Sequence, residues 1–184
     1  MVVFMTDGRR TEIIFAGSGG QGIAKAAEIA GAAACLYDDN YAAMIPNYGP
    51  EARGGRSYAE LVISNIENDN YPLVNEADVL VAMNQETYDA FTGGLLGKLK
   101  PNYLCIVDED LVRVPESQRA YRIPATRLAQ EEGAGIAANI VMLGFFAEVT
   151  GLVNYNSIKR ALKEKFPEKF DINERCLEIG YGKH

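Results

Sequence analysis

Short β-branched runs alternate along the chain with longer stretches of helical pattern. The apolar run at 11–16 predicts a buried strand, and the stretch 23–34, composed of Ala, Ile, Gly, Lys and Glu, predicts a helix. The uninterrupted apolar residues at 79–83 are typical of a strand buried on both faces of a parallel sheet. The same patterns predict further strands at 41–45, 56–64, 103–107 and 119–123, further helices at 85–91, 124–130, 136–150 and 172–180, and a helix that Ser157 caps. Strands separated by helices in this order predict an α/β fold, a Rossmann-like three-layer domain with a mostly parallel sheet.

The length of 184 residues, without an internal repeat or low-complexity tract, predicts a single domain over 1–184. Its C-terminal portion, from about 136 to 184, is predicted to be helical. The most apolar window, 140–147, is far shorter than the roughly 20 residues that a membrane-spanning helix needs. The apolar start at 1–5 is too short for the apolar region of a signal peptide. We therefore expect a cytoplasmic protein with no membrane association.

The ionisable residues and the cysteines restrict the chemistry. The chain has 18 Lys and Arg against 25 Asp and Glu, a net charge of −7, which argues against a nucleic-acid partner. His184 is the only histidine, which argues against Ser-His-Asp or Cys-His catalysis and against a histidine metal site. Cys35, Cys105 and Cys176 form no C-x-x-C motif, and this pattern predicts three buried, reduced thiols. We predict no catalytic residue, no metal ligand and no cofactor bound by this chain alone.

A glycine-rich motif directly follows the first predicted strand. Gly17, Gly19 and Gly22 fit the pattern G-x-G-x-x-G between a strand and a helix, the context that this phosphate-binding pattern requires. Glycines let the backbone approach an anion, and the free N–H groups and the dipole of the helix N-terminus attract it. The dipole contributes about 0.3–1 kcal/mol, whereas millimolar binding needs about 4 kcal/mol, so other groups must contribute. The candidate binding residues here are Gly17, Ser18, Gly19, Gly20, Gln21 and Gly22.

Two alternatives to a phosphate site at this motif concern packing and dinucleotide binding. The glycines can serve only to let the helix and the strand pack closely. A site for NAD would also need an acidic residue at the end of the second strand, about 20 residues further on. Asp38 and Asp39 have that spacing, but they precede the predicted strand at 41–45 and are typical of a solvated turn. We therefore do not expect a dinucleotide-dependent dehydrogenase.

A second group of candidate residues lies in or beside the turn-rich stretch 46–55. This stretch follows the second predicted strand, so in a parallel sheet it should lie at the same end as the glycine motif. Arg53 and Arg56 can supply the bidentate contacts to phosphate or carboxylate that the helix dipole cannot. The alternative is a surface turn whose arginines pair with Glu51 or Glu60. The candidate binding residues in this group are Tyr48, Arg53, Gly54 and Gly55.

Several motifs together carry a resemblance to a known family. The most specific are AGSGGQGI at 16–23 and YGPEARGG at 48–55. Further matching stretches follow in the family's order at 63–64, 71–74, 76–83, 107–108, 123–126 and 139–144. The chain resembles, over most of its length, the gamma subunit of the 2-oxoacid:ferredoxin oxidoreductases.

This resemblance implies a Rossmann-like accessory subunit of a complex that oxidatively decarboxylates a 2-oxoacid, forms an acyl-CoA and reduces ferredoxin. In that family thiamine diphosphate, with Mg, lies between the alpha and beta subunits, and iron–sulfur clusters lie in the beta and delta subunits. The gamma subunit is associated with closure over the active site and with coenzyme A, a phosphate-rich ligand for the glycine motif and Arg53. The implied partners are the alpha, beta and delta subunits and, through the complex, ferredoxin.

Two positions in these motifs bear on the substrate. Pyruvate-type gamma subunits tend to have arginine before Gly-Gly-Gln-Gly and directly after Pro-Glu, whereas Ser18 and Ala52 stand at these places here. The chain is in this respect more similar to the 2-oxoglutarate type. Two functions of other classes stay open: a free-standing Rossmann-type nucleotide-binding or regulatory module, and a scaffold that only contacts partner subunits.

Overall fold

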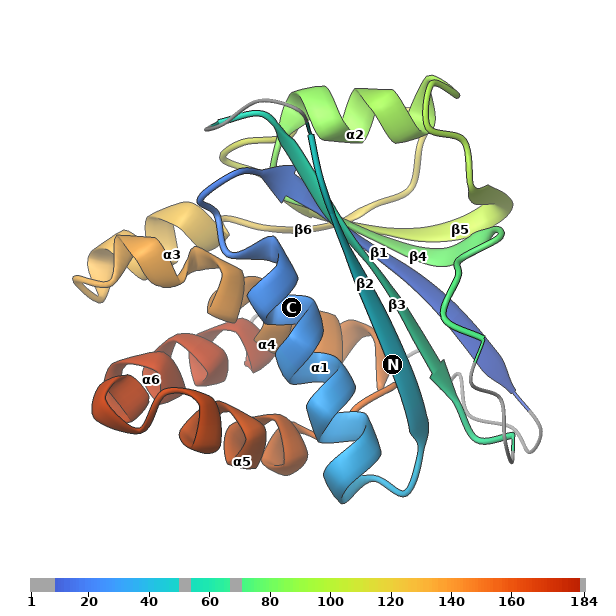
Figure 1. Cartoon of the computed structure of the whole chain (residues 1–184). Helices are drawn as coiled ribbons and strands as arrows, with labels where there is room; N and C mark the ends of the chain where they lie inside the picture. Colours follow the sequence, from blue (N-terminus) through green and yellow to red (C-terminus); the bar gives the residue numbers. More distant parts are fainter. Residues whose placement is uncertain (1–8, 50–53, 67–70, 183–184) are drawn as a thin grey trace.

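The computed structural model describes residues 9–49, 54–66 and 71–182 of the chain. The described residues form one six-stranded sheet and six α-helices (Figure 1). The strands are β1 (Arg10–Ser18), β2 (Tyr41–Tyr48), β3 (Arg56–Ser64), β4 (Ala77–Ala82), β5 (Leu99–Asp108) and β6 (Tyr121–Ile123). The helices are α1 (Ile23–Tyr37), α2 (Gln85–Thr92), α3 (Ala125–Glu131), α4 (Ala138–Thr150), α5 (Tyr155–Lys165) and α6 (Phe170–Tyr181), with short 3-10 turns η1 (Gly135–Ala137) and η2 (Pro167–Lys169).

The sheet is mostly parallel, as the sequence predicts. Its order is β2-β3-β1-β4-β5-β6, and the pairs β1–β4, β4–β5 and β5–β6 are parallel. Strand β3 lies between β1 and β2 and runs antiparallel to both, so β2 has the same direction as β1. Strands β1, β2, β4, β5 and β6 therefore end on one side of the molecule, which we call the carboxyl end of the sheet.

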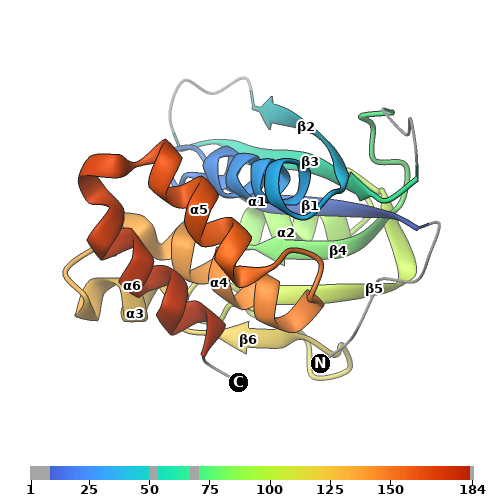
Figure 2. The same cartoon turned by 90° about the horizontal axis from the view of Figure 1, so that it is seen from below.

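The predicted three layers are present, with unequal helix cover on the two faces. Helix α2 lies on one face of the sheet, whereas α1, α3, α4, α5 and α6 lie on the other (Figure 1). Seen from below, these five helices lie in front of the strands (Figure 2). The α/β architecture predicted from the alternating patterns is confirmed.

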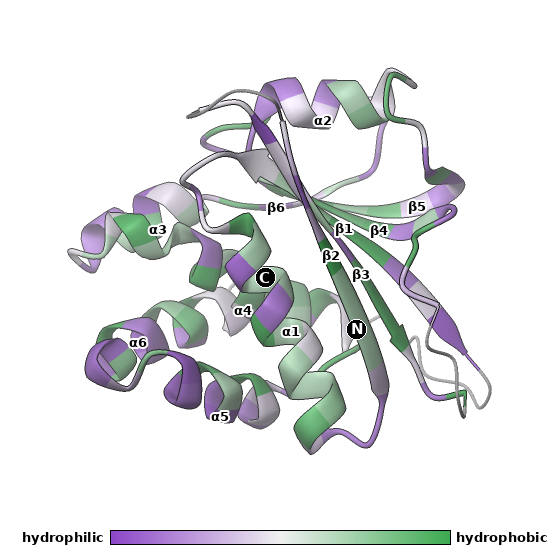
Figure 3. Cartoon of the chain, in the orientation of Figure 1, coloured by the Kyte–Doolittle hydropathy of each residue, from purple (hydrophilic) through white to green (hydrophobic). Residues whose placement is uncertain are grey.

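Alternate residues of each strand supply the two halves of the core. Ile13 and Phe15 of β1 pack in the cluster with α1 and α4, and the Phe15 ring lies 5.2 Å from the Phe146 ring. Ile14 and Ala16 point to the opposite face, where they join the cluster that contains α2. This alternation follows from the two-residue period of a strand. The central strands are accordingly coloured mostly hydrophobic in Figure 3, whereas α5 and α6 carry both colours.

Helix α4 is buried on nearly all its sides, which explains why most of its residues are apolar. Twelve of its 13 residues are buried, and it packs mainly against α6 within the same chain. The predicted helix 136–150 begins in η1, where Ile136 is 86% exposed. Among the described residues, no helix is long and apolar enough to cross a membrane.

Strand β2 is longer than the predicted strand at 41–45, and the prediction of a loop from Pro46 is wrong. Pro46 and Tyr48 belong to β2 and pair with Ala59 and Ser57 of β3. Proline is tolerated there because β2 is an edge strand, and a strand at the edge has one side without a neighbour. The amide of Gly49 continues the ladder by donating to Arg56 O at 2.9 Å.

Two further sequence predictions, the cap of α5 and the burial of all three cysteines, are wrong. Asn154, not Ser157, caps α5, because its side chain accepts from Asn156 N at 2.8 Å. Ser157 is buried and donates its hydroxyl to Asp38, the residue that ends α1. Cys35 is exposed, contrary to the prediction of three buried thiols, whereas burial raises the pKa of the Cys105 thiol to about 12.

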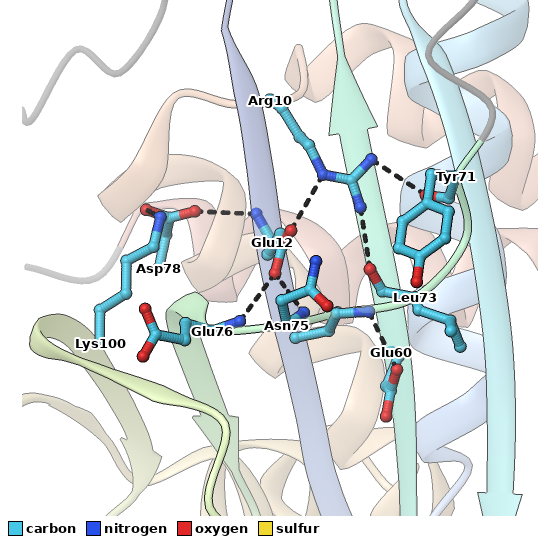
Figure 4. Close-up of polar contacts among 10 residues, drawn as sticks. Arg10, Glu12, Glu60, Tyr71, Leu73, Asn75, Glu76, Asp78 and Lys100 are labelled. Atoms are coloured by element: carbon cyan, nitrogen blue, oxygen red, sulfur yellow. Dashed lines mark hydrogen bonds and ion pairs between the residues drawn. The ribbon is translucent and has the colours of Figure 1, made fainter.

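Two buried glutamates hold residues 74–76 against the sheet (Figure 4). Glu12 of β1 accepts from Asn75 N at 2.6 Å and from Glu76 N at 3.0 Å. Glu60 of β3 accepts from Val74 N at 3.1 Å. These residues belong to no strand, so their N–H groups have no partner in the sheet. The two carboxylates supply the acceptors, which matters because a buried backbone N–H without an acceptor is costly.

Candidate ligand-binding site

The glycine loop, residues 17–22, joins β1 to α1 at the carboxyl end of the sheet. Gly20 and Gly22 have φ angles of 98° and 73°, which side chains rarely adopt, so this turn requires glycine at both positions. Gly22 is the N-cap of α1. The N–H groups of Ile23, Ala24 and Lys25 in the first turn have no acceptor within the helix, as at any helix N-terminus. The loop therefore presents backbone donors to a ligand.

The second predicted loop meets the glycine loop at this end of the sheet, as the direction of β2 requires. Gly19 N donates to Gly55 O at 2.8 Å. A Cβ on Gly19 would lie 3.3 Å from Gly54 N, so the two backbones approach closely. Gly54 has a φ of 75°, and a side chain would be strained there also. Arg53, predicted to contact the ligand, lies outside the described residues.

An open groove of about 360 Å³ lies beside the two loops. The groove is lined by five of the ten predicted binding residues, Ser18, Gly19, Gly20, Gly22 and Tyr48, and by Ile23, Ala24, Lys25, Glu28, Met44, Pro46 and Ser57. Tyr48 of β2, which is 71% exposed, is one of these lining residues. One wall thus offers backbone donors, and the other offers apolar side chains.

The charged groups of the groove are already coupled to one another. Glu28 pairs with Lys25 of the same helix at 3.0 Å and with Lys165 of α5. The hydrogen bond from Lys165 holds the pKa of the Glu28 carboxyl below its ordinary value, and the bond to Glu28 raises the pKa of Lys25. Lys25 therefore stays charged, and an anion in the groove can share it with Glu28.

Gln21 and Gly17 serve the loop rather than the groove. The Gln21 side chain turns inward: its Oε1 accepts from Ser18 N at 2.7 Å, and its Nε2 donates to Met83 O at 2.8 Å. A Cβ on Gly17 would lie 2.4 Å from the Ile23 side chain. Close packing of helix on strand is therefore the role of Gly17, which was the alternative interpretation of the motif.

Other sequence candidates lie away from the groove. Arg56 pairs with Glu86 of α2 at 3.6 Å, neither with Glu60 nor in the groove lining. Asp38 and Asp39 follow the last turn of α1, and a helix of 15 residues places them about 22 Å from the glycine loop. The acidic pair therefore does not complete a dinucleotide site.

Two side chains that hold the glycine loop were missed by sequence reasoning about the site. Thr87 of α2 donates its hydroxyl to Gly17 O at 2.7 Å. Asn139 of α4 donates its amide to Gly22 O at 3.0 Å. They lie 70 and 117 residues away in sequence. Asn139 begins the family stretch 139–144, but nothing in that stretch indicates a contact with Gly22.

A buried carboxyl group at the end of β5 also lies at the carboxyl end of the sheet, where it holds neighbouring backbone segments together. Asp108 accepts from Thr126 N at 3.1 Å and from Asp110 N at 3.1 Å. Burial raises the pKa of this carboxyl, and the hydrogen bonds from Thr126 oppose the rise. The contact fastens the start of α3 to β5. Across the described ranges, no group of three His, Cys, Asp or Glu side chains could hold a metal ion.

The fold and the groove define a class of protein. It is an α/β domain that offers backbone donors and an open groove where parallel strands end, the usual ligand position in such sheets. The family model described as pyruvate ferredoxin/flavodoxin oxidoreductase matches residues 12–183, and the chain belongs to this family.

Relatives within the family indicate which type of 2-oxoacid oxidoreductase the chain is most similar to. The 2-oxoglutarate synthase subunit KorC of Methanocaldococcus jannaschii is 43% identical over 164 residues, covering 86% of this chain and 85% of the relative. The pyruvate synthase subunit PorC of Methanothermobacter marburgensis is 34% identical over 176 residues, covering 94% and 96%. The chain is a subunit of a 2-oxoacid:ferredoxin oxidoreductase and matches the 2-oxoglutarate type better than the pyruvate type.

Two solved structures share the fold. The keto/oxoacid ferredoxin oxidoreductase gamma subunit from Geobacter sulfurreducens PCA superposes with a TM-score of 0.82 at 33% identity, covering 95% of this chain and 96% of that chain. The 2-oxoglutarate:ferredoxin oxidoreductase from Magnetococcus marinus, with 2-oxoglutarate, coenzyme A and succinyl-CoA bound, has a TM-score of 0.81 at 26% identity. That match covers 94% of this chain and 30% of the longer chain. The family predicted from the motifs is confirmed, and a free-standing nucleotide-binding module is not favoured.

Proposed function

We propose that this chain is the gamma subunit of a thiamine-dependent 2-oxoglutarate:ferredoxin oxidoreductase and that its groove binds part of coenzyme A. The reaction converts 2-oxoglutarate, coenzyme A and oxidised ferredoxin to succinyl-CoA, carbon dioxide and reduced ferredoxin. The observation that carries the proposal is the glycine loop, whose backbone donors face a groove of about 360 Å³. The Magnetococcus relative, which binds coenzyme A and succinyl-CoA, supports the choice of ligand.

The residues of the groove suit the chemistry of coenzyme A. Phosphate oxygens need several convergent donors, and the first-turn N–H groups of Ile23 and Ala24 supply them at the positive end of the α1 dipole. Lys25 adds a cation. Met44 and Tyr48 offer an apolar wall for the adenine or the pantetheine arm. A phosphate-rich ligand with a long apolar arm therefore uses both walls of the groove.

The remaining chemistry is assigned to partner subunits in this proposal. Thiamine diphosphate with Mg would lie between alpha and beta subunits, and iron–sulfur clusters would lie in beta and delta subunits and pass electrons to ferredoxin. This chain would act by binding coenzyme A and by closing over the active site. We also propose that residues 1–184 form one domain and that the complex is cytoplasmic.

Gly20→Val in the assembled complex is expected to raise the apparent KM for coenzyme A about tenfold, because a side chain would occupy the groove. A Cβ at Gly20 meets no atom within 4 Å, so the side chain has room, and the cost to the fold is the backbone strain of a side chain at a φ of 98°. Arg53→Ala should act in the same direction by removing a phosphate contact. The measurement is steady-state ferredoxin reduction at varied coenzyme A.

The matched control is Gly151→Val. Gly151 also has a positive φ, 62°, and an open Cβ position. It is the C-cap of α4, at the opposite end of this helix from Asn139. It should carry a strain of the same kind, that of a side chain at positive φ, without changing the KM for coenzyme A. An unchanged KM in both Gly20→Val and Arg53→Ala would contradict the proposal and favour the scaffold role, whereas saturable NAD binding would favour a nucleotide module.

A further inference from the structure

The peptide between Gly17 and Ser18 is fixed from both sides, by a side chain of α2 and by one of the loop itself. Thr87 donates to its carbonyl at 2.7 Å, and Gln21 accepts from its N–H at 2.7 Å. Thr87 is fully buried, so this anchor is shielded from water. The start of the glycine loop is therefore held rigidly before any ligand arrives.

The peptide between Gly22 and Ile23 is held by a side chain from a distant helix, that of Asn139 of α4. Its Nδ2 donates to Gly22 O at 3.0 Å, and the same oxygen accepts from Ala26 N at 3.0 Å within α1. Asn139 is 7% exposed and lies in the first turn of α4. Water therefore has little access to this hydrogen bond and cannot readily replace it.

The planarity of the peptide bond turns this contact into control of a donor. In a trans peptide the C=O of Gly22 and the N–H of Ile23 lie in one plane and point in opposite directions. Fixing the carbonyl therefore fixes the direction of the Ile23 N–H. Ile23 lines the groove, and its N–H is one of the first-turn donors without an acceptor in the helix.

Gly22 and Asn139 also fit each other sterically. A Cβ on Gly22 would lie 2.6 Å from Asn139 Nδ2, a distance that forces one of the two to move. Gly22 also needs its positive φ, 73°. Glycine at position 22 thus admits the Asn139 amide to the carbonyl, and the amide in turn holds the left-handed turn.

We propose that Asn139 is a positioning residue for ligand binding, which aims the Ile23 N–H into the groove by holding the Gly22 carbonyl. This inference rests on the proposed binding of coenzyme A in the groove. A donor that is already aimed needs no ordering when the ligand binds, so its alignment contributes to affinity. Asn139→Asp places a carboxylate oxygen against the Gly22 carbonyl, whereas Asn139→Ala only removes the donor.

The test compares Asn139→Asp and Asn139→Ala with Asn154→Ala in the assembled complex. Asn154 is also an asparagine at a helix start, but its side chain caps α5 by accepting a hydrogen bond from the Asn156 N–H. We expect an increase of about tenfold in the KM for coenzyme A in Asn139→Asp, with a smaller increase in Asn139→Ala. The kcat at saturating coenzyme A and the KM for 2-oxoglutarate should change by less than about twofold, because only ligand binding is weakened.

Hydrogen exchange gives a second readout that does not depend on turnover. Amides in peptides that cover 18–25 should exchange faster in both Asn139 variants and at the original rate in Asn154→Ala. If Asn139→Asp does not assemble, Asn139→Ala carries both measurements, because it introduces no charge.

Each outcome decides between the inference and the function on which it rests. Unchanged exchange at 18–25, or a KM change no larger than that in Asn154→Ala, would overturn the positioning role. If Gly20→Val raises the KM for coenzyme A while both Asn139 variants leave it unchanged, the positioning role is wrong and the coenzyme A groove stands. If all of these variants, with Arg53→Ala, leave that KM unchanged, the proposed function fails and this inference fails with it.

Discussion

Gly180→Ala is expected to lower the midpoint of thermal unfolding by about 6–12 °C, through a loss of about 3 kcal/mol. A Cβ on Gly180 of α6 would lie 2.0 Å from Val141 O of α4, and one on Gly144 of α4 would lie 2.2 Å from Leu177 O. The two helices thus touch backbone to backbone, each through a glycine. Because helix α4 fills the core beneath the sheet, separating it from α6 opens the interior of the fold.

The sign of this effect distinguishes packing from helix propensity. Alanine is about 1 kcal/mol better than glycine inside a helix, so propensity alone predicts stabilisation. Gly182→Ala is the control, since its Cβ would lie 3.5 Å from Glu178 O, an ordinary contact. Thermal melts followed by circular dichroism would compare the two variants of the purified chain. A Gly180→Ala variant as stable as Gly182→Ala would contradict the close contact of α4 with α6.

Lys98→Met is expected to cost about 3 kcal/mol of the free energy of unfolding, because it leaves a buried carboxylate without its cation. The Glu60 side chain is 3% exposed, and Lys98 Nζ lies 2.6 Å from its Oε1. The other oxygen of Glu60 accepts from Val74 N, so the carboxylate cannot turn away without losing this backbone contact. The loss should therefore extend to residues 74–76, which Glu60 and Glu12 hold against the sheet.

Lys100→Met is the matched control for this prediction. Lys100 lies two residues further on and pairs with Asp78 at 2.7 Å, but the Asp78 side chain is more exposed, at 14%. We expect its removal to cost under about 1 kcal/mol, because water can solvate the carboxylate that remains. Urea unfolding of both variants would measure the difference. Equal losses in the two variants would show that the burial of Glu60 does not set the cost.

The groove explains how a chain without a predicted catalytic residue serves an oxidoreductase. Among the described residues, its lining offers backbone donors and one cation, Lys25, which is shared with Glu28. Such a groove suits the binding and orienting of a ligand, which is the role we propose for it. The arrangement suits a subunit that acts on the substrate of a reaction carried out elsewhere in the complex.

The sequence by itself determined the features that depend on neighbours along the chain. The apolar run of β1, the glycines at 17–22 and the alanine-rich α1 follow one another directly, so local propensity and turn chemistry predicted the strand, loop and helix. The shared direction of β1 and β2 then predicted that the loop before Gly55 meets the glycine loop. The family motifs predicted the 2-oxoglutarate type for the same reason, since each is a contiguous string.

The tertiary structure alone decided what depends on contacts between distant segments. The placement of β3 between β1 and β2 made β2 an edge strand, and only that position allows Pro46 inside it. The sequence predicted Ser157 as the cap of α5, but the Ser157 hydroxyl donates to Asp38, over 100 residues earlier in the chain, and Asn154 is the cap.

The roles of individual site residues were decided in the same way. Gln21 turned out to hold the loop because Met83 O lies within reach of its amide, and Asn139 reaches Gly22 O across 117 residues of sequence. Hydrogen bonds of this kind depend on distances of about 3 Å between atoms. A one-dimensional pattern fixes which segments form strands and helices, but packing of the whole chain fixes which atoms come that close.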